Sequence, residues 1–171
     1  MTLTDQSTQV RPGEELDAAL IDPYLKASIP GLSGTPVISQ FPGGASNLTY
    51  LLEYPQQEFV LRRPPFGHKA KSAHDMGREY RILNQLNAGF PYCPKAYVHC
   101  TDESVIGAEF YVMERVNGII LRSDMPAELN FSAEQTRELC KSFIDKMVEL
   151  HNVDYQACGL GDLGKPEGYV H

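Results

Sequence analysis

The stretch that decides the fold is FPGGASNLTYLLEYPQQEFVLRR, which runs from Phe41 to Arg63. It contains two apolar runs, Leu48–Tyr54 and Gln57–Arg63, with a proline between them, a pattern typical of two strands joined by a turn. A bend with two adjacent glycines, Pro42–Asn47, comes directly before the first run, and glycine lets backbone N–H groups approach a ligand because no Cβ stands in the way. The stretch therefore indicates either a phosphate site, with strand-borne arginines supplying charge, or an ordinary hairpin with a solvated arginine pair.

Composition and charge argue against several classes of partner. The chain has 171 residues, 42% hydrophobic and 22% charged, as expected for a globular protein of one domain or two small parts. Its net charge of −7 disfavours binding to nucleic acid or anionic membranes, because both need a basic surface. No apolar run approaches the roughly 20 residues of a transmembrane helix. Residues 1–20 lack the basic and apolar regions of a signal peptide.

The cysteines indicate free thiols in a reducing compartment. Cys93, Cys100, Cys140 and Cys158 show no C-x-x-C spacing. A metal cluster of Cys93, His99 and Cys100 is disfavoured, because no fourth ligand lies at a recognisable zinc spacing. We therefore expect a cytoplasmic protein with no disulfides.

Three helices are predicted from their capping signals. Asp22, followed by a proline, is expected to begin a short helix before the sheet. Residues 72–75 fit a capping box that begins a second helix. Ser132 and Gln135 form another capping box, and the apolar spacing after it predicts a long third helix over Ala133–Asn152.

Three further strands complete the predicted sheet. They are Pro36–Phe41, Lys95–Thr101 and Glu109–Val116. Because the five strands are joined by hairpins or by one helix, we expect a mostly antiparallel sheet packed against a helix, which is an α+β arrangement.

The second helix carries a carboxylate at the edge of its apolar stripe. Glu79 falls at the edge of a stripe formed by Met76, Tyr80, Leu83 and Leu86. A carboxylate facing a core is costly unless it is paired. Strand alternation places Arg62 on one face and Arg63 on the other, so an Arg62–Glu79 pair is predicted. The alternative is that Glu79 reaches solvent.

Several motifs together resemble a known superfamily. GGASN at residues 43–47, FVLRR, HDMGREYRIL and FYVMERVNG resemble the small lobe and linker of protein-kinase-like small-molecule kinases, the aminoglycoside phosphotransferase and choline kinase superfamily. VLRRPP and LHNVDYQACGLGDLGKPEGYV are closer still to the phosphotransferase domain found alone in bacteria or joined to acyl-CoA dehydrogenases. The resemblance covers Asp22 to His171.

The resemblance implies a nucleotide site. Asn47 would brace a loop that covers the ATP phosphates. Arg62 would take the place of the strand lysine that contacts phosphate oxygens, and Glu79 would orient it. Val60 would touch the adenine, and Met113 would stand at the back of the pocket. The remaining members are backbone groups: the Glu114 carbonyl and Val116 amide at the adenine edge, and those of Gly43, Gly44, Ala45 and Ser46 over the phosphates.

The sequence departs from the pattern of the superfamily at two points within this site. The loop is not G-x-G-x-x-G, so its cover of the phosphates is expected to be looser. The strand cation is arginine, which offers a planar fork where lysine offers a point charge. If the strand register slips by one residue, Arg63 takes the role of Arg62 instead.

The groups that carry out phosphoryl transfer in this superfamily are missing from the sequence. The resemblance requires an Asp near the substrate hydroxyl and an Asn and an Asp for Mg²⁺, all in a large lobe. No motif here matches them, and neither Asp154 nor Asp162 is assigned a catalytic role. We therefore expect metal ligands outside this chain and no activity for the chain alone. The expected division is a partly disordered segment over residues 1–21, a small lobe over 22–116, a linker over 117–131 and the truncated start of a large lobe over 132–171.

The predicted function is the nucleotide-binding part of an ATP-dependent phosphotransferase acting on a small-molecule hydroxyl. The alternatives are a non-catalytic kinase-like binding module and an unrelated α+β domain. Aminoglycoside, amino-alcohol and hydroxyacyl substrates stay open, with the dehydrogenase-linked likeness favouring the last. The apolar stripe of the helix over Ala133–Asn152 is expected to be covered by the rest of a large lobe or by self-association.

Overall fold

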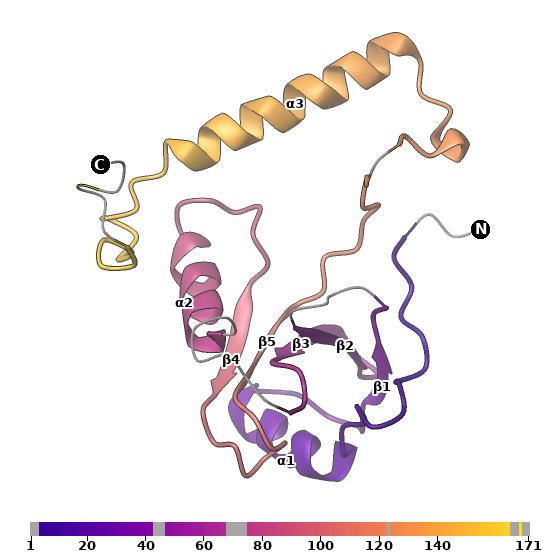
Figure 1. The fold of residues 1–171 in the computed structure, drawn as a ribbon, viewed down its shortest axis with the longest axis vertical. Coiled ribbons are helices and arrows are strands. Elements are labelled where there is room, and N and C mark those ends of the chain that lie inside the picture. Colours follow the sequence, from indigo (N-terminus) through magenta and orange to yellow (C-terminus); the bar gives the residue numbers. More distant parts are fainter. Residues whose placement is uncertain (1–3, 43–46, 68–74, 123, 165–167, 169–171) are drawn as a thin grey trace. The chain divides into compact units, whose positions relative to one another are not determined.

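A computed structural model describes residues 4–42, 47–67, 75–122, 124–164 and 168. It confirms the α+β fold and the expected order of elements (Figure 1). The strands are β1 (Val37–Gln40), β2 (Leu48–Glu53), β3 (Glu58–Arg63), β4 (Ala96–Cys100) and β5 (Phe110–Glu114). The helices are α1 (Ala18–Ser28), α2 (Met76–Leu86), the 3₁₀ turn η1 (Ala127–Leu129) and α3 (Ala133–His151).

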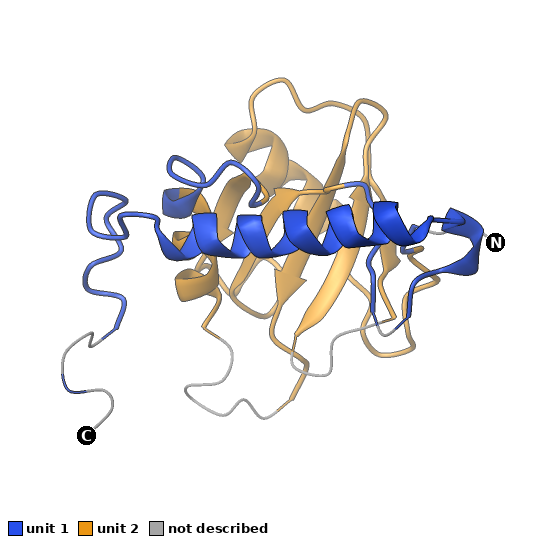
Figure 2. Ribbon diagram, turned by 90° about the horizontal axis from the view of Figure 1, so that it is seen from above, with its two compact units in different colours: residues 1–5, 85–93, 117–171 blue, residues 6–84, 94–116 orange. Residues whose placement is uncertain are grey.

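The chain divides into two compact units. Residues 6–84 and 94–116 form one, and residues 1–5, 85–93 and 117–171 form the other (Figure 2). The first contains the whole sheet, so the sequence motifs of the predicted nucleotide site fall mostly within it.

The five strands form one antiparallel sheet in the order β1-β2-β3-β5-β4. Hairpins join β1 to β2 and β2 to β3, while α2 lies in the connection between β3 and β4. This connection carries β4 to the outer edge, and β5 then returns between β3 and β4. As a result β3 is a central strand, and its alternating side chains face two different environments.

One face of the sheet is closed by α1. Ile21 and Leu25 of α1 are fully buried in a single apolar cluster with the side chains that alternate along the strands. The strand members are Leu48, Tyr50, Leu52, Phe59, Leu61, Val98, Cys100, Phe110 and Val112. Tyr24 adds an edge-to-face contact with Phe110, with ring centroids 5.7 Å apart. We call this surface the closed face.

The start of α1 differs from the prediction. The helix begins at Ala18, because Asp17 is the N-cap and its side chain accepts a hydrogen bond from the Ala19 N–H at 2.8 Å. Pro23 therefore lies inside the helix, where a proline costs one backbone hydrogen bond. Burial of the apolar side of α1 offsets this cost.

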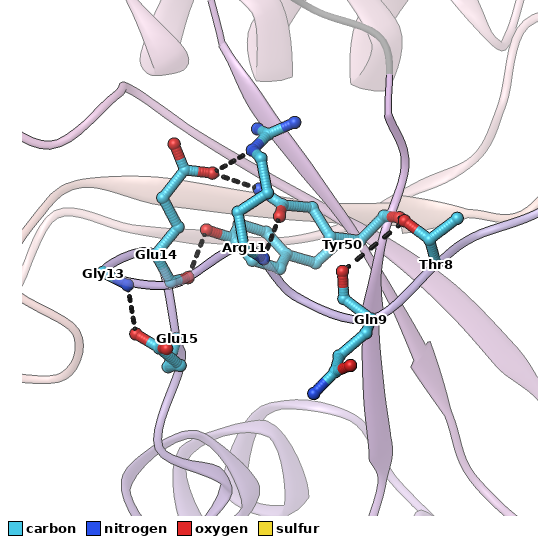
Figure 3. A network of polar contacts seen from close by, with 8 residues as sticks. Thr8, Gln9, Arg11, Gly13, Glu14, Glu15 and Tyr50 are labelled. Carbon is cyan, nitrogen blue, oxygen red and sulfur yellow. Dashed lines mark hydrogen bonds and ion pairs between the residues drawn. The ribbon is translucent and has the colours of Figure 1, made fainter.

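The segment before α1 is tied to the edge of the sheet by a polar network (Figure 3). Thr8 and Gln40 exchange backbone hydrogen bonds, 2.8 and 2.9 Å long. The buried Gln40 amide donates to Glu14 Oε2 at 2.6 Å, and the Tyr50 hydroxyl donates to the Glu14 carbonyl at 2.7 Å. The hydrogen bond from Gln40 lowers the pKa of the Glu14 carboxyl. The network satisfies buried polar groups beside β1 and β2 and covers the otherwise open edge of β1.

The caps of α2 and α3 show one correction and one confirmation. Asp75 caps α2, accepting a hydrogen bond from the Arg78 N–H at 2.7 Å; the predicted cap Ser72 lies outside the described residues. The capping box of α3 is present as predicted, with Ser132 and Gln135 bonding each other's backbone. Among the described helices, none has the length and apolarity needed to cross a membrane.

Candidate nucleotide site on the open face of the sheet

The face of the sheet opposite α1, which we call the open face, carries a row of polar side chains. Register partners share a face, and the pairing aligns Thr49 of β2 with Arg62 of β3, Arg62 with Tyr111 of β5, and Tyr111 with His99 of β4. The row therefore crosses four strands at one level. The next level is apolar, since Leu51 pairs with Val60 and Val60 with Met113.

Glu79 of α2 meets this polar row. Its Oε2 accepts the Tyr111 hydroxyl at 2.8 Å and lies 3.4 Å from Arg62 Nη1. Its Oε1 accepts the Asn47 side-chain amide at 2.9 Å. The predicted Arg62–Glu79 pair is confirmed, and β3, β5, α2 and the residue just before β2 converge on one half-buried carboxylate.

Arg62 has hydrogen-bonding capacity beyond this pair. Its Nε–H is buried and has no hydrogen-bond partner among the described residues. A buried guanidinium donor without an acceptor is costly, and it is satisfied well by an oxygen of an anionic group. The site thus presents a cation that is paired with Glu79 and has one buried donor without an acceptor among the described residues.

Arg63 is buried on the opposite face of the sheet, so the alternative in which it replaces Arg62 is wrong. Its side chain enters the closed face and is only 2% exposed. Its Nη1 donates to the Ile106 carbonyl at 3.0 Å and its Nε to the Pro64 carbonyl at 3.1 Å. The guanidinium also lies 3.7 Å above the Phe66 ring. Burial lowers the pKa of Arg63, and this arginine links two loops at the end of the sheet.

Tyr111 is a site residue that was not predicted from the sequence. It is 1% exposed, and burial, with the hydrogen bond to Glu79, raises the pKa of its hydroxyl well above the usual range. Strand alternation places Tyr111 and Met113 on one face, and a buried tyrosine hydroxyl needs a polar partner. Alternation along EFYVMERV would therefore have drawn attention to it.

The residues predicted to contact adenine lie at one end of β3 and β5. Val60 and Met113 are register partners, and Val60 is buried. The Glu114 N–H donates to the Lys95 carbonyl at 2.8 Å, and the Lys95 N–H donates to the Glu114 carboxylate at 3.1 Å. Val116 lies beyond the strand and is exposed. Their contact with a nucleotide stays a prediction.

Other predicted site residues are placed as follows. Gly43, Gly44, Ala45 and Ser46 lie outside the described residues, whereas Asn47 is buried and bonded to Glu79. Within the described parts of the chain, no group of three His, Cys, Asp or Glu side chains is arranged to hold a metal ion.

Comparisons with known proteins agree with this architecture. Residues 37–170 match the model of the phosphotransferase enzyme family. The chain is 33% identical to acyl-CoA dehydrogenase family member 11 of Gallus gallus over 174 residues, covering 99% of this chain and 22% of the relative. The human protein of the same name is 33% identical over 167 residues, covering 94% of this chain and 21% of that protein.

A solved structure gives the same result. The crystal structure of a putative aminoglycoside phosphotransferase from Ralstonia eutropha JMP134 superposes with a TM-score of 0.77 and 33% identity, covering 91% of this chain and 44% of that one. The chain spans about a fifth of the length of the curated relatives cited above, 22% and 21%.

Proposed function

Because this chain belongs to the phosphotransferase enzyme family, we propose that the open face of its sheet is the nucleotide-binding part of an ATP-dependent phosphotransferase acting on a small-molecule hydroxyl. The observation that carries the proposal is the pairing of Arg62 with Glu79 across β3 and α2, with a donor of the arginine left unsatisfied. A cation held on a strand by a helix carboxylate is the arrangement that positions nucleotide phosphates in kinase-like folds.

The electrostatics of the site support phosphate binding. Glu79 receives hydrogen bonds from two neutral donors, the Tyr111 hydroxyl and the Asn47 amide, in addition to its ion pair with Arg62. These donors share the negative charge of the carboxylate, so Arg62 is oriented without being fully neutralised. A planar guanidinium can then bond phosphate oxygens through the donors that Glu79 does not use.

The apolar level next to Arg62 supports the adenine half of the proposal. Val60 and Met113 are apolar register partners on the open face, two residues along the strands from the Arg62–Tyr111 pair. At the end of β5 the Lys95 N–H bonds the Glu114 carboxylate. The N–H and the carbonyl of Glu114 lie on the same edge of the strand. We propose that this carbonyl accepts a hydrogen bond from the adenine edge and that the Val116 amide next to it donates one.

The catalytic half of the enzyme is proposed to lie outside this chain. Residues 22–116 would be the small lobe, residues 117–131 the linker and residues 132–171 the start of the large lobe, whose remainder would supply the Mg²⁺ ligands, the catalytic Asp and the substrate site. When bound, Mg²⁺ supplies charge neutralisation of the phosphates. The relatives named as acyl-CoA dehydrogenases favour a hydroxyacyl substrate, and the free cysteines favour a cytoplasmic enzyme.

Calorimetric titration with ATP, with and without Mg²⁺, tests the site. Arg62→Ala should raise the Kd by about 10- to 100-fold, the value of one charge-assisted hydrogen bond, and Arg62→Lys should fall between it and the unmodified chain. Arg78→Ala is the matched control, because Arg78 is an exposed arginine of α2. Equal affinities for the unmodified chain and Arg62→Ala, or an Arg78→Ala effect of the same size, would refute the proposal.

We also propose that α3 associates through its apolar side. Phe143 is 68% exposed, and Ile144, Met147 and Val148 on the same helix are exposed as well. A patch of this kind favours packing against another apolar surface, and for this chain alone that surface is a second copy. Light scattering after size-exclusion chromatography should give a dimer that Phe143→Ser converts to a monomer; a monomer for the unmodified chain contradicts the association.

A further inference from the structure

A second cluster lies on the open face, between α2 and the outer strand β4. His99 Nε2 of β4 is 2.6 Å from Glu109 Oε1, just before β5. The Tyr80 ring of α2 stacks on the imidazole, with centroids 5.1 Å apart and planes inclined by 22°. The side chains of His99 and Glu109 are 22% and 33% exposed, so the pair is half-buried between helix and sheet.

The first turn of α2 approaches this pair as closely as a glycine permits. A Cβ on Gly77 would lie 3.2 Å from His99 Cε1 and 3.4 Å from Glu109 Oε1. The first separation is tighter than ordinary van der Waals contact and the second is at its lower limit, so a side chain at this position would require His99 to shift by a few tenths of an ångström. The lack of a side chain at Gly77 therefore allows the short distance between α2 and the sheet at this point.

That distance governs the predicted phosphate site. Glu79 and Tyr80 are consecutive in α2: Tyr80 contacts His99, and Glu79 bonds Tyr111 and pairs with Arg62. His99 and Tyr111 are themselves register partners on β4 and β5. A displacement of α2 from His99 would thus carry Glu79 away from Tyr111 and Arg62.

We propose that the His99–Glu109 pair is the positioning element of α2, and that it sets nucleotide affinity without touching the nucleotide. The inference rests on the proposed function, since nucleotide affinity is its functional consequence. Either an imidazolium or a neutral imidazole with its proton on Nε2 can donate to Glu109. A glutamine, whose amide N–H reaches a similar position, should therefore replace His99 in part.

Titration with ATP tests the role of the pair. His99→Leu should raise the Kd about three- to tenfold, the effect of one lost hydrogen bond, while His99→Gln recovers most of the affinity and Gly77→Ala weakens it in the same direction. Tyr97→Leu is the control for a purely structural effect. Tyr97 lies on the same strand but packs on Phe59 and the closed-face cluster, so its loss should lower the Tm with no change in Kd. A Kd unchanged by His99→Leu, or raised equally by Tyr97→Leu, overturns the proposal.

A double-mutant cycle shows whether the effect passes through Glu79. In a Glu79→Gln background, His99→Leu should leave the Kd where it is, because the group that it positions has been altered. Independent, additive losses would contradict positioning. If the unmodified chain binds no ATP, the proposed function fails, and hydrogen exchange then tests the inference separately. Amides of residues 76–84 should exchange faster in His99→Leu and Gly77→Ala and regain protection in His99→Gln; unchanged exchange overturns it.

Discussion

Two neighbouring arginines at the end of β3 differ in almost every respect. Arg63 is buried on the closed face, bonds two loop carbonyls and lies over an aromatic ring. Arg62 is half-exposed on the open face, shares a carboxylate with two neutral donors and has one buried donor with no partner among the described residues. The Nε–H and Nη1 donors of Arg63 are bonded within the protein, whereas Arg62 has a buried donor that the proposed phosphate would satisfy.

The same contrast extends to the two faces of the sheet. The closed face is an apolar layer sealed by α1, with its polar atoms bonded within the protein. The open face carries a polar row that meets α2 through a single carboxylate and a histidine–glutamate pair. We therefore expect closed-face substitutions to act on stability and open-face substitutions to act on binding.

The largest expected effect is on the closed face. Phe110 is fully buried against Tyr24 and the apolar cluster, so Phe110→Ala should lower the free energy of unfolding by about 3–5 kcal/mol. Urea denaturation followed by circular dichroism measures the change. Val116→Ala is the control, because this residue is 63% exposed and its truncation should leave the midpoint almost unchanged. A loss below about 1 kcal/mol for Phe110→Ala would show that the face is not a packed core.

The arginine pair gives the next largest effect. Arg63→Met should cost about 2 kcal/mol, because it leaves the Pro64 and Ile106 carbonyls without their donor. Arg62→Met should cost less than about 1 kcal/mol, since it removes a half-exposed ion pair and an unsatisfied donor together. Denaturation midpoints of the two variants, measured side by side, test the contrast. Equal losses would mean that Arg62 is as structural as Arg63.

Much of the sheet and one central contact were predictable from the sequence. Apolar runs separated by turn residues gave the five strands, and alternation along FVLRR distinguished Arg62 from Arg63. The position of Glu79 on the edge of a helical stripe then identified it as the partner of Arg62. These predictions succeeded because period and parity are local properties of the chain.

Features that depend on distant segments were not predictable. The Asp22-Pro23 signal was misleading, because the cap is Asp17 and burial of Ile21 and Leu25 keeps Pro23 within the helix. The contact of Tyr111 with Glu79 depends on the order of β3, β5 and β4, which no local pattern specifies. The hydrogen bonds between β1 and the segment before α1, such as Gln40–Glu14 and Thr8–Gln40, join residues about 30 positions apart. No local pattern predicts contacts over such separations.

At alkaline pH, a buried tyrosine of the closed face should affect stability, whereas an exposed tyrosine should not. Burial raises the pKa of Tyr50 to about 12, so folding favours its neutral phenol. This contribution to stability is complete below the ordinary pKa of about 10 and is lost as the pH rises toward 12. Tyr50→Phe should therefore make the fall in stability over this range shallower, as measured by denaturation at each pH, whereas Tyr155→Phe, at an exposed position, should leave the slope unchanged. An identical slope for the two variants would contradict the assignment.

The smallest expected effect on stability is at the hydroxyl that joins the open face to α2. Tyr111→Phe removes one hydrogen bond to Glu79, but Arg62 and Asn47 still contact the carboxylate, so the free energy of unfolding should fall by only about 0.5–1 kcal/mol. Without the phenol, Glu79 has one donor fewer and draws Arg62 more strongly, which leaves the guanidinium less available to a phosphate. The Kd for ATP should therefore rise, even though the loss of stability is small. If Tyr111→Phe lowers stability but binds ATP as tightly as the unmodified chain, Tyr111 acts on stability alone, as expected of closed-face residues, despite its position on the open face.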